Sequence, residues 1–218
     1  MKKFLLIVCL VAALPCVVSA QEAPPFWKEI VAFKAADAHT AYAASPILFV
    51  GSSSFTKWTD VNAYFPGYPI INRGFGGSTL LDVIRYTYDV ILPYKPKQVV
   101  VYCGENDIAD HVQPAAVVLR FRTLFAMIRE NLPSTTIDFV SIKKSPSRWQ
   151  FFPEVLEVNK AIAAFLGTQP NTAYIDINPI MLDADGNPQP ALFLDDLLHM
   201  KPEGYARWKK VILPYLLR

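Results

Sequence analysis

Cysteine and histidine are scarce in this sequence, and their scarcity argues against internal disulfide bonds and against metal sites built from these residues. Of 218 residues, 3 are cysteine and 3 are histidine. Cys9 and Cys16 lie in the first twenty residues, so Cys103 stands alone in the rest of the chain and no internal disulfide is expected there. The apolar run from Val99 to Tyr102 predicts that Cys103 is a small buried core residue rather than a reactive thiol. No His and Cys cluster suggests a metal site.

The sequence also lacks a strong excess of charge of either sign. It has 21 Lys and Arg against 19 Asp and Glu, and without Lys2 and Lys3 of the first twenty residues the count is 19 of each sign. A neutral chain without a basic stripe is not expected to have nucleic acid or an anionic membrane surface as its main partner. Its hydrophobic content of 52%, with no repeat or long linker, suits a single domain over residues 21–218.

The first twenty residues have the pattern of a secretory signal peptide. Two lysines are followed by an apolar segment and then by Val18, Ser19 and Ala20, small residues suited to cleavage. The apolar run is short for a membrane-spanning helix and is interrupted by Pro15. A lipid anchor on Cys16 is the alternative, but Pro15 is bulky where lipid attachment usually wants a small residue. We therefore expect a secreted or periplasmic protein that is cleaved after Ala20 and is not stably inserted in a membrane.

Apolar strands alternate with amphipathic helices along the rest of the chain. This alternation predicts a parallel sheet of about five strands with helices on both faces, a three-layer α/β/α sandwich. In such sheets the ligand crevice lies beyond the carboxyl ends of the strands. The expected strands are 47–50, 69–72, 98–103, 136–142 and 173–177, and the expected helices are 25–44, 80–92, 114–131, 153–166 and 202–216.

Three consecutive serines follow the first of these strands. The strand from Ile47 to Val50 is uncharged and rich in β-favouring side chains, and Gly51 ends it. A hydroxyl on a tight turn after a central strand is held where a substrate can reach it, so one of Ser52–Ser54 is a candidate nucleophile. Most such turns only cap a helix or form a loop. The catalytic interpretation therefore requires a base, an orienting carboxylate and donors for an oxyanion elsewhere in the chain.

Three further blocks supply those groups. They are NRGFGGST at 72–79, GEND at 104–107 and DLLH at 196–199. Together with GSSS at 51–54, and in this order, they closely resemble the SGNH subgroup of the GDSL esterases and lipases. The spacing and the ending HMKPEGYARW at 199–208 most resemble the platelet-activating-factor acetylhydrolase type and the bacterial carbohydrate esterases.

The resemblance implies a flavodoxin-like hydrolase fold and a role for five residues. It implies that Ser53 is the nucleophile, that His199 is the base and that Asp196 orients His199. It also implies an oxyanion hole formed by the backbone amides of Ser53 and Gly77 and by the side chain of Asn106. The residue types suit this chemistry, which passes through a covalent acyl-enzyme and needs no cofactor.

Some of these residues also have a structural interpretation. Asn106 is suited to an Asx turn after a strand, and Asp195 is near enough in sequence to replace Asp196, although the Asp-x-x-His spacing of the family selects Asp196. Ser52 and Ser54 are the expected helix caps. Because Ser52 stands where the family usually has aspartate, we expect it to keep part of the hydrogen bonding of the turn without the charge.

The loop from Lys143 to Phe152 follows a strand end and is expected at the same crevice. Its cations, Lys143, Lys144 and Arg148, belong either to a solvated loop or to a site for an anionic group of the substrate. Trp149 and its aromatic neighbours fit either stacking on a sugar or lining of an acyl pocket. For Trp58, packing beside the core is at least as good an interpretation.

We predict a secreted serine esterase that acts on small-molecule or glycan esters. A short acyl group is expected, with acetate on a carbohydrate as the favoured case, because the chain has no obvious apolar lid or amphipathic membrane helix. A lysophospholipase, a thioesterase or an acyltransferase would use the same residues. A non-catalytic glycan-binding protein on the same fold is the alternative of another class, in which Ser52 in place of the usual aspartate would be a sign of lost catalysis. The presence of all four reactive positions argues against this alternative.

Overall fold

The structure, a computed structural model, describes residues 22–218 and has a five-stranded parallel sheet at its centre. The strand order is β2-β1-β3-β4-β5, which is the flavodoxin-like order. The predicted fold class is therefore confirmed, whereas the signal peptide expected over residues 1–20 lies outside the described residues. The strands are β1 (Ile47–Gly51), β2 (Ile70–Gly74), β3 (Gln98–Tyr102), β4 (Thr136–Val140) and β5 (Thr172–Ile175).

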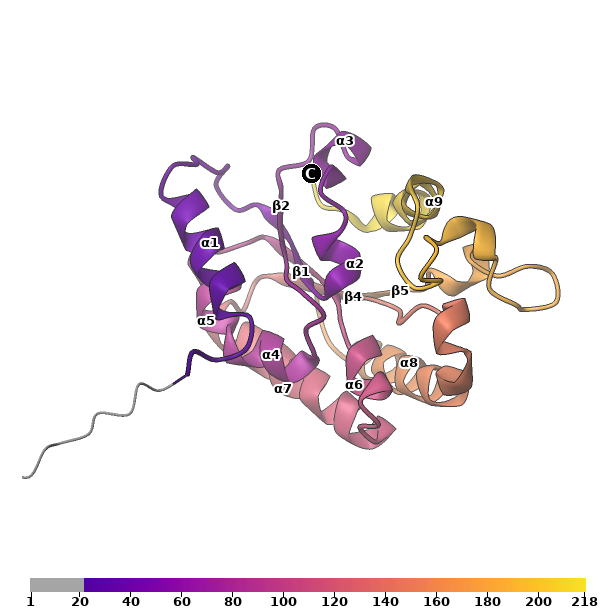
Figure 1. The fold of residues 1–218 in the computed structure, drawn as a ribbon. Coiled ribbons are helices and arrows are strands. Elements are labelled where there is room, and N and C mark those ends of the chain that lie inside the picture. Colours follow the sequence, from indigo (N-terminus) through magenta and orange to yellow (C-terminus); the bar gives the residue numbers. More distant parts are fainter. Residues whose placement is uncertain (1–21) are drawn as a thin grey trace, which may run out of the picture.

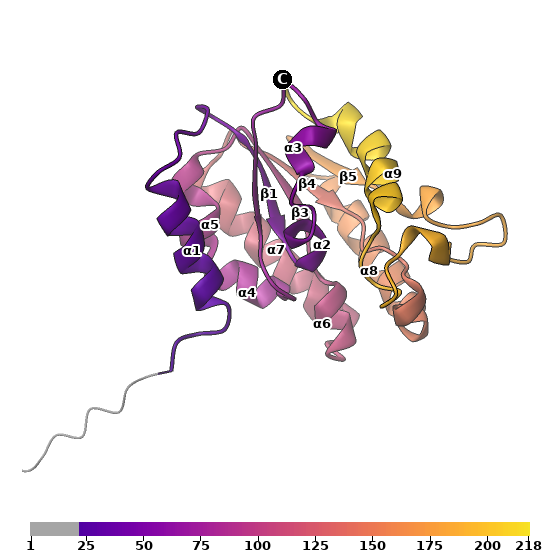
Figure 2. The same ribbon diagram turned by 45° about the horizontal axis from the view of Figure 1, so that its top comes forward.

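Helices cover both faces of the sheet, and the two faces are packed differently (Figures 1 and 2). Alternate residues of a strand point to opposite faces. Leu48 and Val50 of β1 therefore belong to one apolar core, and Ile47 and Phe49 to the other. We call the first side the helical layer; it contains α1 (Trp27–Asp37), α4 (Leu80–Arg85), α5 (Thr87–Val90), α7 (Pro114–Asn131) and α8 (Phe152–Leu166). We call the second side the aromatic layer; it contains α2 (Ser53–Thr56), α3 (Val61–Tyr64) and α9 (Pro202–Ile212).

The longest helix of the helical layer, α7, has the bounds that the sequence predicts. Pro114 occupies its first turn, where a missing backbone N–H costs nothing. Its buried residues recur every three or four positions and form one stripe against the sheet. They are Val117, Phe121, Leu124, Phe125 and Ile128.

The aromatic layer packs large rings between the sheet and short helices. Phe49 of β1 lies 4.9 Å from Phe55 of α2, measured between ring centroids. Trp58 stacks on Tyr205 of α9 at 4.7 Å and is fully buried, as the packing interpretation of Trp58 predicts. These contacts attach α2 and α9 to the same face of the sheet, so the segments that precede and follow them are placed relative to each other.

Three predicted helices differ from the observed ones. The helix expected over 25–44 ends at Asp37, where the carboxylate pairs with Arg73 and accepts a hydrogen bond from Tyr42. The helix expected over 80–92 is divided into α4 and α5, and the last helix ends before a 3₁₀ turn that contains Pro214. Cys103 is buried, as predicted. No helix within residues 22–218 is both long enough and apolar enough to cross a membrane.

Candidate active site

The turn after β1 places Ser53 at the carboxyl edge of the sheet. Gly51 has φ +137°, and a Cβ there would lie 1.9 Å from the Tyr102 carbonyl oxygen, so no other residue fits. The Ser52 amide donates to the same carbonyl at 2.9 Å. Ser53 follows as the first residue of α2, and its side chain is partly exposed. The turn therefore holds one serine hydroxyl toward the solvent from a rigid strand.

A second turn, just before α9, brings His199 to this serine. The Nε2 atom of His199 lies 2.9 Å from the Oγ atom of Ser53. The other ring nitrogen, Nδ1, lies 2.6 Å from Oδ2 of Asp196. Oδ1 of Asp196 accepts the backbone amides of Leu198 and His199 at 3.0 and 2.9 Å, which closes the turn. The structure thus pairs His199 with Asp196 rather than with Asp195.

The hydrogen bonds of this turn also fix the charge of Asp196. Burial alone would raise the pKa of this carboxyl. Hydrogen bonds from the His199 ring and from the backbone amides of His199 and Leu198 outweigh burial and lower the pKa of Asp196 well below its usual range. An ionised carboxylate in this position holds the imidazole in one orientation and stabilises the positive charge that forms when the imidazole takes up a proton.

Asn106 and Gly77 form the opposite wall of the site. Asn106 is in α6 (Glu105–Ala109), and a Cβ added at Gly77 would lie 3.7 Å from its Nδ2 atom. Nδ2 donates one hydrogen bond to Ser52 Oγ at 2.8 Å and another to the Ser78 carbonyl at 3.1 Å. Within residues 22–218 no acceptor is found for the Gly77 amide. The structure thus brings the three expected oxyanion donors to one place, with the Asn106 amide already engaged.

A pocket of about 480 Å³ opens at these groups. Its wall contains every residue of the predicted site except Asp196, which lies behind His199. The surface that the wall exposes is mainly apolar, and Leu198 is its one large apolar side chain. The lining residues are Ser53, Thr56, Lys57, Gly76, Gly77, Asn106, Leu198 and His199.

Side chains that have no part in the predicted site hold its blocks together. The Ser78 hydroxyl donates to the Gly51 carbonyl at 3.1 Å and so joins the Gly77 segment to the Ser53 turn. Asp107 is fully buried and accepts from the Leu80 amide at 2.9 Å and from Arg120 at 2.7 Å. Burial raises the pKa of Asp107, and these two hydrogen bonds oppose the rise. Asp107 thereby ties the turn of Asn106 to the start of α4.

Two expectations from the sequence are wrong in this region. Lys143 is neither a solvated cation nor available to an anionic substrate, because it is fully buried in an ion pair with Glu105. Ser52 precedes α2 but its side chain makes no capping hydrogen bond; it accepts from Asn106 instead. The Ser54 side chain accepts from Lys143 and caps no helix either. The position of Lys143 directly after the predicted strand 136–142 is a clue to this ion pair, because a lysine in such a place is buried only when an anionic group pairs with it.

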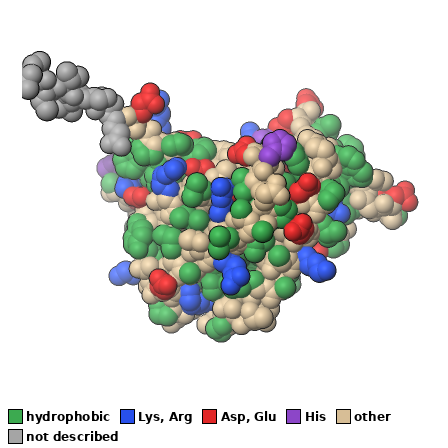
Figure 3. Space-filling model, turned by 90° about the horizontal axis from the view of Figure 1, so that it is seen from below, with side chains coloured by type: hydrophobic (Ala, Val, Ile, Leu, Met, Phe, Trp, Pro, Cys, Tyr) green, Lys and Arg blue, Asp and Glu red, His purple; other side chains and the backbone are tan. Residues whose placement is uncertain are grey.

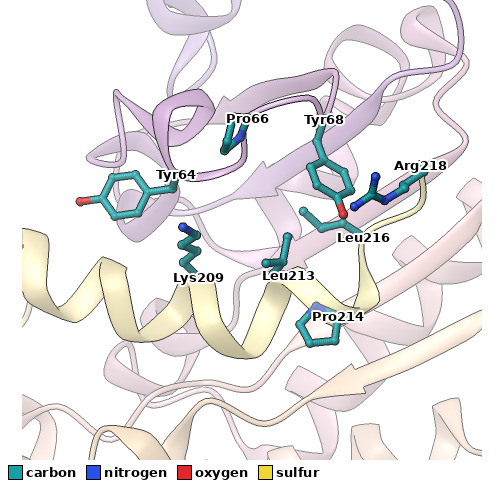
Figure 4. A pocket seen from close by; sticks show the side chains of 8 residues that line it. All are labelled: Tyr64, Pro66, Tyr68, Lys209, Leu213, Pro214, Leu216 and Arg218. Atoms are coloured by element: carbon teal, nitrogen blue, oxygen red, sulfur yellow. The ribbon is translucent and has the colours of Figure 1, made fainter.

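A second hollow, of about 680 Å³, lies between the end of α9 and the segment from Tyr64 to Tyr68 (Figure 4). It contains none of the predicted site residues. Its lining includes two tyrosines, Tyr64 and Tyr68, and two cationic side chains, Lys209 and Arg218. In the part of the chain that the structure describes, no three His, Cys, Asp or Glu side chains gather as a metal-binding group.

The fold and the site together define a serine hydrolase of the α/β/α class. The sequence profile of the GDSL-like lipase/acylhydrolase family matches residues 40–207, and this chain belongs to that family. It is an ester-hydrolysing serine hydrolase, and the resemblance seen in the sequence is confirmed. None of the curated protein sequences compared with it matches.

Solved structures with the same fold share little sequence with this chain. A Streptococcus pneumoniae protein provisionally described as a platelet activating factor superimposes with a TM-score of 0.77 at 18% identity, over 87% of this chain and 92% of the other. A GDSL-like lipase from Bacteroides thetaiotaomicron gives 0.71 at 16% identity, over 85% and 95%. A catalytic mutant of an acetylxylan esterase from Geobacillus stearothermophilus gives 0.62 at 14% identity, over 80% and 95%.

Proposed function

We propose that this protein hydrolyses short-chain acyl esters, with acetate on a carbohydrate as the favoured substrate, through a covalent acyl-serine on Ser53. The observation that carries the proposal is the unbroken chain from Ser53 Oγ to His199 Nε2 at 2.9 Å and from His199 Nδ1 to Asp196 at 2.6 Å. A serine hydroxyl is a weak nucleophile until a base within hydrogen-bond distance removes its proton.

The first half of the reaction forms the acyl-enzyme. Ser53 Oγ attacks the ester carbonyl carbon while its proton passes to His199 Nε2, and the carbonyl oxygen becomes an oxyanion. His199 then gives this proton to the oxygen of the departing alcohol as the ester C–O bond breaks. In the second half a water molecule repeats the attack on acyl-Ser53, with His199 again moving the proton, and releases the acid.

The oxyanion is stabilised by the amides of Ser53 and Gly77 and by the side chain of Asn106. One donor of this kind contributes about 3 kcal/mol to catalysis in comparable sites. Since both hydrogens of Asn106 Nδ2 are engaged in the free enzyme, one of them has to leave Ser52 or Ser78 when the oxyanion forms.

The pocket supports a short acyl group. Around Ser53 it is lined by Gly76, Gly77, Thr56 and Lys57, and Leu198 is its one large apolar side chain. A long acyl chain would need a longer apolar surface to repay its transfer from water. The similarity in fold to an acetylxylan esterase agrees with an acetyl group on a glycan.

Export and the expected partners form part of the proposal. The pattern of residues 1–20 supports a secreted or periplasmic location, and mass spectrometry of the exported protein tests whether it begins at Gln21. Nucleic acid is not a proposed partner: on the face seen in Figure 3, Lys and Arg side chains are scattered among acidic and apolar ones and form no single patch.

Release of p-nitrophenol from esters of increasing acyl length tests the activity, with Ser53→Ala as the inactive variant. Ser134→Ala is the matched control, because Ser134 is an exposed serine far from the pocket. We expect turnover that is fastest with acetate, lost in Ser53→Ala and unchanged in Ser134→Ala. Release of acetate from acetylated xylooligosaccharides then tests the glycan. Fastest turnover with long chains would favour a lysophospholipase or thioesterase, and an active Ser53→Ala would refute the nucleophile.

A further inference from the structure

A cluster of buried polar side chains lies directly behind the site and takes no part in the reaction described above. Its centre is Lys143, whose ammonium pairs with Glu105 and donates to Ser54 Oγ at 3.2 Å and to the Tyr102 hydroxyl at 3.1 Å. Glu105 in turn accepts the hydroxyls of Tyr102 at 2.8 Å and Ser145 at 3.2 Å. All three ammonium hydrogens thus have acceptors, as a lysine in the interior requires.

The members of this cluster are the sequence neighbours of the proposed catalytic groups. Ser54 follows Ser53 in α2, and Glu105 precedes Asn106 in α6. Lys143 comes from a third element, the segment after β4. Its ammonium therefore helps to set the distance between the turn of the nucleophile and the helix of an oxyanion donor. The Asn106–Ser52 hydrogen bond, the hydrogen bonds of Ser78 to both segments and the paired strands also join these two parts.

The segment that Lys143 begins also reaches the third part of the site. The backbone amide and the hydroxyl of Ser147 both donate to the Leu197 carbonyl, at 3.1 and 3.0 Å. Leu197 lies between Asp196 and His199 and has φ +53°, in the left-handed region that is unfavourable for leucine. Such a backbone conformation persists only where neighbouring groups hold it, and Ser147 supplies two of the hydrogen bonds that do so.

We propose that Lys143 is a positioning residue for ester hydrolysis and that the segment Lys143–Ser147 aligns Ser53, Asn106 and the Asp196–His199 turn with one another. The cluster offers no second nucleophile, because Ser54 is 1% exposed and Lys143 is committed to Glu105. The inference rests on the proposed catalytic roles. Alignment matters because a displacement of about 1 Å in such a site can cost about 100-fold in rate.

Two mild variants test the inference without removing the buried ion pair. Ser54→Ala deletes the contact between Lys143 and α2, and Ser147→Ala deletes one of the two hydrogen bonds to Leu197. We expect each to lower kcat with acetate ester by about three- to tenfold with KM almost unchanged, and to slow the labelling of Ser53 by a fluorophosphonate in proportion. Labelling reports the alignment of Ser53 with His199 and is insensitive to how the substrate binds.

A control for instability and a test of coupling complete the experiment. Arg129→Met removes a cation that holds four backbone carbonyls far from the site, so it should lower Tm and leave kcat and the labelling rate unchanged. Ser54→Ala should cost less activity in an Asn106→Ala background than in the parent. The alignment of Ser53 with the Asn106 side chain no longer contributes to catalysis once that side chain has been removed.

The larger variant is Lys143→Met combined with Glu105→Gln, which leaves no unpaired charge in the interior. We expect it to fold with a lower Tm and to lose about 100-fold in kcat. Ser54→Ala and Ser147→Ala at parental kcat and parental labelling rate would overturn the inference. So would an equal loss of kcat and labelling rate in Arg129→Met, because the losses would then follow from lower stability alone. An active Ser53→Ala would instead overturn the proposed function, so the two failures are distinguishable.

Discussion

The helical layer and the aromatic layer cover the same sheet but differ in what their side chains do. In the helical layer, α7 and α8 contribute 18 and 15 residues of regular helix whose apolar stripes meet the sheet. In the aromatic layer, α2 and α3 have only 4 residues each, and buried rings fill the space that short helices leave. The proposed nucleophile and base both come from this second layer, on α2 and on the turn before α9.

The difference shows how a short, irregular layer can be rigid enough for chemistry. Trp208 of α9 lies 6.3 Å from Phe55 of α2 and 4.9 Å from Tyr102 of β3, measured between ring centroids. Each ring buries a large apolar surface with few rotatable bonds, so its contacts cost little conformational entropy. Helix α2 and the His199 turn are thereby held to one face of the sheet. On the other face, the long helices α7 and α8 pack their apolar stripes against it.

The strongest test of this contrast removes the charge that orients His199 and leaves both layers intact. Asp196→Asn keeps the shape of the side chain but loses the carboxylate, whose pKa lies well below its usual range. We expect kcat to fall by about 10³- to 10⁴-fold with Tm nearly unchanged. Asp195→Asn changes the neighbouring, exposed carboxyl and should leave kcat as it is. Equal losses in the two variants would show that general charge at the turn matters, not the hydrogen bond to His199.

A pair of core substitutions, one in each layer, tests whether the aromatic layer supports the site. Trp208→Ala and Phe121→Ala each empty a fully buried position and should each lower the free energy of unfolding by about 3 to 5 kcal/mol. Measured at a low temperature at which both variants are folded, Trp208→Ala should also lower kcat, whereas Phe121→Ala should not. Loss of kcat in Phe121→Ala, or its retention in Trp208→Ala, would show that the two layers do not differ in this respect.

A buried carboxyl in the aromatic layer makes that layer sensitive to pH. Burial raises the pKa of Asp138 in β4 to about 6, against the effect of a hydrogen bond from Gln98. The folded chain therefore binds this proton more tightly than the unfolded chain, in which the pKa is near 3.8. This contribution to stability is complete below about pH 4 and is lost as the pH rises through about 6, a loss of about 2 to 3 kcal/mol.

Urea unfolding of the parent and of Asp138→Asn between about pH 4 and 8 measures this contribution. Asparagine does not titrate, so the variant should gain stability relative to the parent as the pH rises. Taking the difference between the two proteins removes the effects of all other titrating groups. Parallel stability curves would show that Asp138 has an ordinary pKa in the folded chain.

The sequence predicts the elements whose pattern is local and misses those that depend on distant partners. Strands β1 and β3 each contain a continuous apolar run, and α7 has a periodic stripe between Pro114 and Asn131, so these elements are evident without the fold. The helix expected to continue to residue 44 is rich in alanine, a good helix former. It ends at Asp37 because Arg73 and Tyr42, which come later in the chain, bind that carboxylate.

The same distinction applies to the site. Ser53, Gly77 and Asn106 could be placed together from the sequence because each follows a parallel strand, and such strands end at one edge. Nothing local in the sequence shows that Ser52 accepts from Asn106, 54 residues away, or that Lys143 pairs with Glu105, 38 residues away. These hydrogen bonds join strand ends that are adjacent only in the folded sheet, and they define how the groups are aligned.

The smallest expected effect concerns Ser52, where the family usually has aspartate. The buried Ser52 hydroxyl accepts a hydrogen bond from Asn106, so Ser52→Ala should leave that amide less well fixed and lower kcat by about fivefold, or about 1 kcal/mol. Ser52→Asp restores a carboxylate acceptor and a stronger hydrogen bond to Asn106. If the acceptor is what matters, Ser52→Asp keeps kcat close to that of the parent. A kcat for Ser52→Ala equal to the parental value would show that Asn106 is held well enough by the Ser78 carbonyl alone.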